Sequence, residues 1–201
     1  MAQVRALAAA CEAVRHVLES AAAADSLGFD ASFQVFGSSD FSAGTITTGV
    51  SVFLYRVLPN LAHRTPAGRL QPNGQRQRTQ LPLDLHLLLT AWGEVPDTVN
   101  TLVGWMMRTL EDYPTLPASV LNISHPGTFS PDESVELVVG EMAGEELLHL
   151  WEVLGQQTTY HISVPYVARA LFIESQRQVT TAGPVQARLL DMGVLAERGV
   201  A

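Results

Sequence analysis

The stretch LPLDLHLLLTAWG, Leu81–Gly93, repeats leucine at every second position and predicts a β-strand. The odd-numbered leucines from Leu81 to Leu89 fall on one face of this strand, whereas Asp84 and His86 fall on the other. A period of two with one polar face is typical of antiparallel sheets that are packed on one side. We therefore expect a sheet with one apolar and one wet face, to which the flanking segments contribute.

Local patterns on either side of this strand predict the remaining elements. Apolar runs rich in β-branched and aromatic residues predict four more strands, at Phe33–Gly37, Thr45–Leu58, Ser134–Gly140 and Thr158–Ser175. Apolar positions at three- and four-residue steps predict helices at Ala2–Ala24, at Pro96 to just before Pro114, and at Ala143–Gly155. Pro165, inside the last strand, argues for a sheet edge or a bulge.

The order of these elements predicts the fold class. A helix, three strands, a helix, a strand, a helix and a strand do not follow the strict βα alternation of a doubly wound sheet. We predict a single α/β (α+β) domain over residues 1–175, with a mixed, mostly antiparallel sheet and flanking helices on one side. Residues 176–201 are predicted to form a C-terminal arm.

Charge and composition exclude several classes of function. The chain has 201 residues, a net charge of −8 and a low charged fraction of 16%, which suggests surface that a partner covers. An acidic chain lacks the basic face that nucleic acid requires. The start of the chain lacks a signal-peptide pattern and an uninterrupted apolar span, so we expect assembly in the cytoplasm and no membrane span. Cys11 is the only cysteine, so no disulfide can form within the chain.

Few residues are candidates for chemistry. Glu146 and His149 have the three-residue spacing of carboxylate–histidine metal ligation, but the second copy that a di-metal site needs is missing. The polar residues on predicted strands, Asp84, His86 and His161, are interpreted as ordinary outward-facing residues. We therefore predict no catalytic residue, no metal and no cofactor, and favour an assembly component over an enzyme.

Two segments are candidates for partner contacts. The loop Leu61–Gln80 is longer than most loops in compact domains and contains Arg64, Arg69, Arg76 and Arg78. We predict that these arginines contact acidic groups of a partner; the alternative is a solvated loop. The C-terminal arm contains apolar residues that should dock on a partner, Val185, Leu189, Leu190 and Met192 among them. The alternative is a helix that folds back on its own subunit.

Three segments taken in order resemble a known family. VSVFLYRVLPNLAHRT, then LPLDLHLLLTAWG, then LWEVLG followed by YHISVPYVARALFIES are similar to the cap, or tail-terminator, family of extracellular contractile injection systems. These are headless, phage-tail-like bacterial particles. The resemblance covers about residues 2–175, and the ordered set carries it rather than any single motif.

The resemblance implies a structural role. It implies a phage tail-terminator-like fold and a homo-hexameric ring at the distal end of the particle. The ring would seat on the inner tube protein and the sheath protein, end their polymerisation and stabilise the extended particle. The alternatives are another structural component of the same machine, such as a tube-initiating or adaptor protein, or an enzyme of unrecognised type. The resemblance does not distinguish a particle that stays in the cytoplasm from one that is released.

Overall fold

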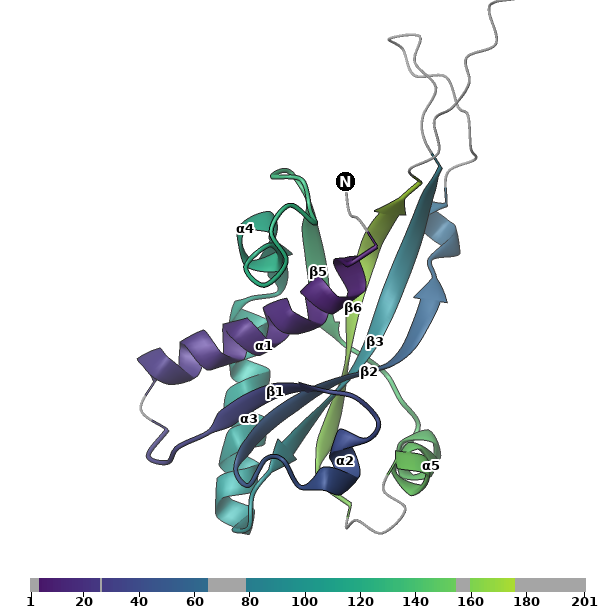
Figure 1. Cartoon of the computed structure of the whole chain (residues 1–201). Coiled ribbons are helices and arrows are strands. Elements are labelled where there is room, and N and C mark those ends of the chain that lie inside the picture. The colour runs from purple at the N-terminus through teal and green to yellow at the C-terminus, as the bar shows by residue number, and fades with distance from the viewer. Residues whose placement is uncertain (1–3, 26, 65–78, 155–159, 176–201) are drawn as a thin grey trace, which may run out of the picture.

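The computed structural model describes residues 4–25, 27–64, 79–154 and 160–175 (Figure 1). Its helices are α1 (Ala6–Ala24), α2 (Asp40–Ala43), α3 (Pro96–Asp112), α4 (Ala118–Leu121) and α5 (Gly144–Leu154), with a 3-10 turn η1 (Leu61–His63). Its strands are β1 (Ser32–Phe36), β2 (Gly49–Pro59), β3 (Gln80–Trp92), β4 (Thr115–Pro117), β5 (Ser134–Val139) and β6 (Ser163–Glu174). The five predicted strands and three predicted helices are all present.

The six strands form one sheet in the order β1-β2-β3-β6-β5-β4. Only β1 and β2 are parallel, and the other four pairs are antiparallel. The predicted mixed, mostly antiparallel sheet is therefore confirmed. The alternating stretch that forms β3 lies inside the sheet, between β2 and β6, because both of its edges are hydrogen-bonded.

One face of the sheet carries the main core. The odd-numbered leucines of β3, from Leu83 to Leu89, are buried there together with Val50 and Val52 of β2. α1, α3 and α4 cover this face (Figure 1). The alanines of α1 allow close packing because their side chains are small, and Ala6, Ala9, Ala10 and Ala13 are all buried.

The other face is covered as well, and the prediction of helices on one side only is wrong. α2 and α5 lie on this face at one end of the sheet, around an aromatic cluster made by Phe36, Phe41, Ile46, Trp92 and Trp151. Asp84 and His86 made the even-numbered face of β3 look polar throughout. Beyond His86 the even positions are Leu88, Thr90 and Trp92, and all three are buried.

β6 is an interior strand, so Pro165 does not mark a sheet edge. Its carbonyl accepts a 2.8 Å hydrogen bond from the Gly140 N–H, one residue past the end of β5. In an antiparallel pair the backbone N–H and C=O of one residue point to the same neighbouring strand, so both positions of Pro165 face β5. Proline has no N–H to donate, but β5 has already ended at this point, so no strand-to-strand bond is lost. Pro82 in β3 uses the same arrangement, since its carbonyl accepts from the Asn60 N–H just past β2.

Besides η1, three short elements were not predicted. The sequence patterns indicated no element at α2 or in the segment that forms β4 and α4. A three-residue strand and two helices of a single turn contain too few residues to show a period. Leu116 and Leu121 are nevertheless fully buried, so this connector contributes to the core.

Candidate assembly surface

Three strands continue beyond the strands that flank them. β1 pairs only with Gly49–Phe53 of β2, and β5 pairs only with Tyr166–Arg169 of β6. Past these pairs, β2, β3 and β6 form a three-stranded ribbon, which Figure 1 shows extending past α1 to the upper right. We call this ribbon, residues 54–59, 80–87 and 170–174, the projecting ribbon. Among the described residues, neither of its outer edges is paired with another strand.

Asp84 organises the projecting ribbon. Between Leu83 and Leu85 the register with β6 shifts, so that Asp84 faces two residues of β6. One of them, Ala170, has a φ of 56°, a left-handed conformation that costs about 1–2 kcal/mol for a residue with a Cβ. The Asp84 carboxylate accepts a 3.0 Å bond from the Ala170 N–H and bonds of 3.1 and 3.0 Å from the Asn60 amide. Asp84 therefore holds the bulge and the end of β2 in place.

The two histidines considered alongside Asp84 lie apart from each other. His86 packs edge-on against Tyr55 at 5.9 Å, and its pKa is lowered, chiefly by burial. His161 stacks on Trp92 at 4.4 Å at the other end of the sheet, and burial lowers its pKa too. A lowered pKa keeps each imidazole neutral near pH 7. Because the two imidazoles lie at opposite ends of the sheet, they are not arranged for shared acid–base work.

The residues with metal-ligand spacing on α5 have other partners. Glu146 pairs with Arg56 of β2 at 3.2 Å, and His149 lies 3.4 Å from Glu152. The Arg56 pair links α5 to the projecting ribbon, while Trp151 anchors α5 in the aromatic cluster. No group of three potential metal ligands occurs in the described parts of the chain.

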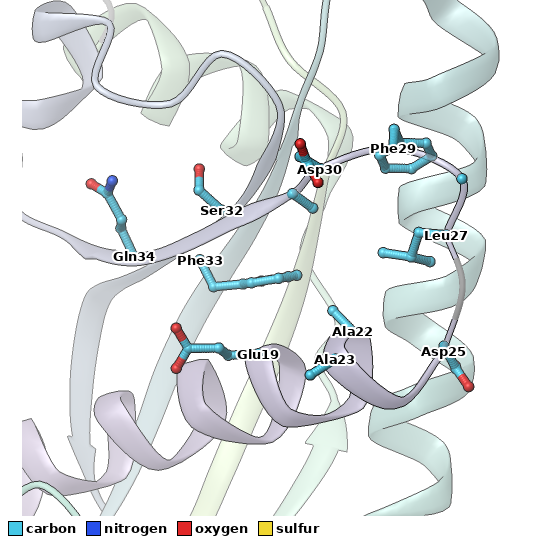
Figure 2. A pocket seen from close by; sticks show the side chains of 12 residues that line it. Glu19, Ala22, Ala23, Asp25, Leu27, Phe29, Asp30, Ser32, Phe33 and Gln34 are labelled. Carbon is cyan, nitrogen blue, oxygen red and sulfur yellow. The ribbon is translucent and has the colours of Figure 1, made fainter.

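A cleft lies between the end of α1, the following loop and β1 (Figure 2). It has a volume of about 830 Å³, and its lining mixes polar side chains with apolar ones that include Phe33. Two of its three carboxylates are already paired: Glu19 with Arg15 at 2.7 Å, and Asp25 with Arg108 at 2.9 Å. Figure 2 shows Asp25 turned away from the cleft. Among the described residues that line the cleft, none is a histidine, cysteine or lysine.

Of the predicted contact residues, the structure places Arg64, which is exposed directly after η1. The other predicted residues lie outside the described ranges: Arg69, Arg76, Arg78, Val185, Leu189, Leu190 and Met192. Near Arg64 lie three exposed leucines that the sequence patterns did not mark as surface residues, Leu58, Leu61 and Leu81, which are 41%, 72% and 42% exposed. Leu81 fell on the leucine face of its predicted strand, but the covering helices end before this part of the sheet.

Together these features define a class of protein. The chain is a mixed α/β domain with both sheet faces partly covered, an open projecting ribbon and exposed apolar residues at the ribbon's end. No helix of the described residues is long and apolar enough to cross a membrane. These are the properties of a domain that contacts other proteins through its surface.

The family follows from comparison with known proteins. Residues 9–187 match the model of the Pvc16 N-terminal domain, so this chain belongs to the Pvc16 N-terminal domain family. No curated protein matches the chain. The resemblance to tail terminators of contractile injection systems, seen in the sequence, is confirmed.

Two solved structures are similar to this chain. One is the sheath/tube terminator of PVC, an extracellular contractile injection system, in its extended state; the TM-score is 0.58, the identity is 16%, and 98% of this chain aligns with 66% of that one. The other is the tube-terminating cap of the anti-feeding prophage, with a TM-score of 0.46, 18% identity, and coverage of 71% of this chain and 49% of the cap. The first likeness confirms the terminator-like fold. This chain spans about two thirds of the length of the first protein and about half that of the second.

Proposed function

We propose that this chain is the structural cap of a contractile injection system. It binds the distal end of the inner tube and the sheath, stops both polymers from growing and stabilises the extended particle. The observation that carries the proposal is the family match over residues 9–187, which agrees with a terminator-like fold across nearly the whole chain. A structural role also suits the polar residues of this surface, because Asp84 stabilises the bulge in β6 and the Arg56–Glu146 pair links β2 to α5.

The partners are a second copy of the chain, the sheath protein and the inner tube protein. The copies are proposed to form the homo-hexameric ring that the resemblance implies, and a cyclic ring uses heterologous contacts that close. The runner-up is another structural part of the same machine, such as a tube-initiating or adaptor protein. Imaging of labelled chain on particles separates the two, because a cap occurs only at the end away from the baseplate.

The contact residues are proposed to include the arginines Arg64, Arg69, Arg76 and Arg78. Exposed ion pairs contribute only about 0–1 kcal/mol each, so several must act together. Replacing all four arginines with glutamine should leave the fold intact and weaken incorporation into particles, more so at high salt. The far-UV circular dichroism spectrum is the control for folding, and unchanged incorporation would contradict the proposal.

The C-terminal arm, residues 176–201, is proposed to dock on a partner through apolar residues that include Val185, Leu189, Leu190 and Met192. Truncation after Ser175 should leave a chain with a near-normal melting temperature. Particles made with the truncated chain should vary in length or lose their sheaths. A truncated chain that fails to fold, or one that terminates particles normally, would show that the arm has another role.

A further inference from the structure

Charge is unevenly distributed along this chain. Residues 41–83 contain five arginines and no acidic residue. Residues 84–154 contain twelve acidic residues and one arginine. Of these five arginines the structure describes Arg56 and Arg64, both at the end of β2 or just after it. β2 lies toward one side of the sheet, whereas β5 and β4 lie at the opposite side.

The side formed by the end of β2 is apolar and carries one exposed cation, Arg64, while the Asp84 carboxylate, in register with Leu58, is bonded to the Asn60 amide. Val57, Leu58 and Leu61 are 37%, 41% and 72% exposed, and exposed Arg64 follows them directly. Arg56, in the same strand, already pairs with Glu146. We call Val57, Leu58, Leu61 and Arg64 the basic edge. Apolar side chains next to an exposed cation are typical of a surface that binds a protein partner.

The opposite side is acidic and also apolar. Tyr113 and Val139 are 54% and 50% exposed, and Glu111 and Asp112 occupy the last turn of α3. The Leu137 N–H donates to the Pro114 carbonyl at 2.7 Å, which brings the end of α3 against β5. We call Glu111, Asp112, Tyr113 and Val139 the acidic edge. Nearby, the cation Arg169 is in register with another carboxylate, Glu136.

The position of the two acidic residues suggests that a partner compensates them. Carboxylates at a helix C-terminus are unfavourable because the helix dipole is negative there. Within the described part of the chain, neither Glu111 nor Asp112 has a cation within ion-pair distance. A positively charged contact from outside the domain would remove this cost.

The two edges cannot meet within one chain. From β2 to β5 the sheet is three strand spacings wide, or about 14 Å at ~4.8 Å per spacing. The basic and acidic edges therefore point away from each other. A contact between them must join two copies, and it uses a different surface on each copy. Such a heterologous contact is the kind that closes into a ring.

We propose that the basic edge of one copy packs against the acidic edge of a second copy. The proposal rests on the proposed function, for which it names the surfaces through which neighbouring copies meet. Val57, Leu58 and Leu61 lie against Tyr113 and Val139, and Arg64 faces the carboxylates at the end of α3.

Both edges favour contact between side chains over the addition of a strand. The outer half of β2 contains a register shift at Tyr55 and ends at Pro59. The opposite edge strand, β4, has three residues; it begins just after Pro114 and ends at Pro117. Bulges, prolines and short strands are the features that prevent open-ended strand pairing. The contact is thereby limited to one neighbour on each side.

Charge exchange between copies tests the proposal. A basic-edge variant, Leu61→Asp/Arg64→Glu, and an acidic-edge variant, Glu111→Arg/Asp112→Arg, each place like charges opposite one another. All four residues are exposed, so both variants should keep the melting temperature of the parent chain to within a few degrees. Each variant alone should self-associate about tenfold more weakly or worse. Their equimolar mixture should regain assembly, with equal numbers of both variants in each ring by native mass spectrometry.

A matched control uses the other end of α3. Glu94→Arg/Asp97→Arg makes the same change of charge at exposed carboxylates outside both edges, and it should assemble like the parent chain. The proposal is overturned if the parent chain stays monomeric at every concentration. It is also overturned if either edge variant assembles normally, or if the mixture assembles no better than its components.

The position of the chain on the particle is measured separately. A chain that occupies the tube end, but whose edge variants assemble unchanged, would refute the edge contact and leave the cap function standing. Rings that respond to charge exchange, but are absent from the tube end, would refute the cap function alone.

Discussion

Replacement of Asp84 by alanine should loosen the projecting ribbon without unfolding the domain. The Asp84 carboxylate accepts from the backbone N–H of Ala170 and from the side-chain amide of Asn60. Alanine at this position leaves both donors without their acceptor. It also removes the group that stabilises the left-handed backbone at Ala170, where φ is 56°.

The size of the effect follows from the number and kind of bonds that are lost. A hydrogen bond to a charged group contributes about 1.5–3 kcal/mol when it is buried. Asp84 is only half-buried, so water replaces part of each bond, and we expect a total loss of about 2 kcal/mol. For a chain of this length, that loss corresponds to a decrease of roughly 4–8 °C in melting temperature.

Thermal and urea unfolding, followed by circular dichroism, measure this loss. Asp84→Asn is the matched control, because its one remaining carbonyl oxygen can still accept from Ala170, and it should lose about half as much. A double-mutant cycle with Ala170→Gly tests the bulge, since glycine adopts the left-handed conformation without strain. Asp84→Ala should then cost less in the glycine background than in the parent chain.

Two results would refute this reasoning. A loss below about 0.5 kcal/mol for Asp84→Ala would mean that water satisfies both donors, as at an ordinary surface position. Equal losses in the parent chain and in the Ala170→Gly background would mean that Asp84 does not stabilise the bulge.

Three further predictions concern the aromatic cluster and the pairing of β1. Because burial lowers the pKa of His161, the unfolded chain takes up the imidazole proton at a higher pH than the folded chain does, and stability should fall as pH drops below about 6.5. Unfolding curves of His161→Phe at several pH values should show a weaker fall in stability. An unchanged pH dependence would contradict this. Trp151→Ala should cost about 3–5 kcal/mol and release α5, seen as a loss of near-UV circular dichroism, whereas Leu148→Ala, at an exposed site on the same helix, should be nearly neutral. Gly49→Ala should cost more than about 2 kcal/mol in urea unfolding, because φ is +149° there and a Cβ would lie 1.9 Å from the Ser32 carbonyl oxygen; a neutral result would mean that β1 can shift.

The class of fold could be predicted because its signals are local. The two-residue period of β3 and the three- and four-residue steps of α1 and α3 are each visible within one segment. Pro82 and Pro165 lie where the pairing of their strand with one neighbouring strand ends, but a proline in the sequence does not show which strand that neighbour is. Pro165 therefore suggested an edge, although β6 lies between β3 and β5.

The residues of the candidate surface were harder to predict from the sequence than the fold class. Arg64 was identified because arginines in a long polar loop are conspicuous in an acidic chain. Leu58, Leu61 and Leu81 were missed because an exposed leucine and a buried leucine look alike until the extent of the covering helices is known. The acidic edge was missed for a related reason: only the strand order brings the end of α3 beside β5 and opposite β2.

The sequence by itself determined the α/β class, the mostly antiparallel sheet, the low charge and the resemblance to tail terminators, since periodicity, composition and ordered motifs are properties of neighbouring residues. Only the tertiary structure decided that helices cover both faces of the sheet, because Phe41, Trp92 and Trp151 meet from three distant segments. Only the structure showed that Asp84 supports a bulge in β6, because its bond partner is 86 residues away along the chain. Contacts of this kind depend on which strands become neighbours, and no local pattern encodes that choice.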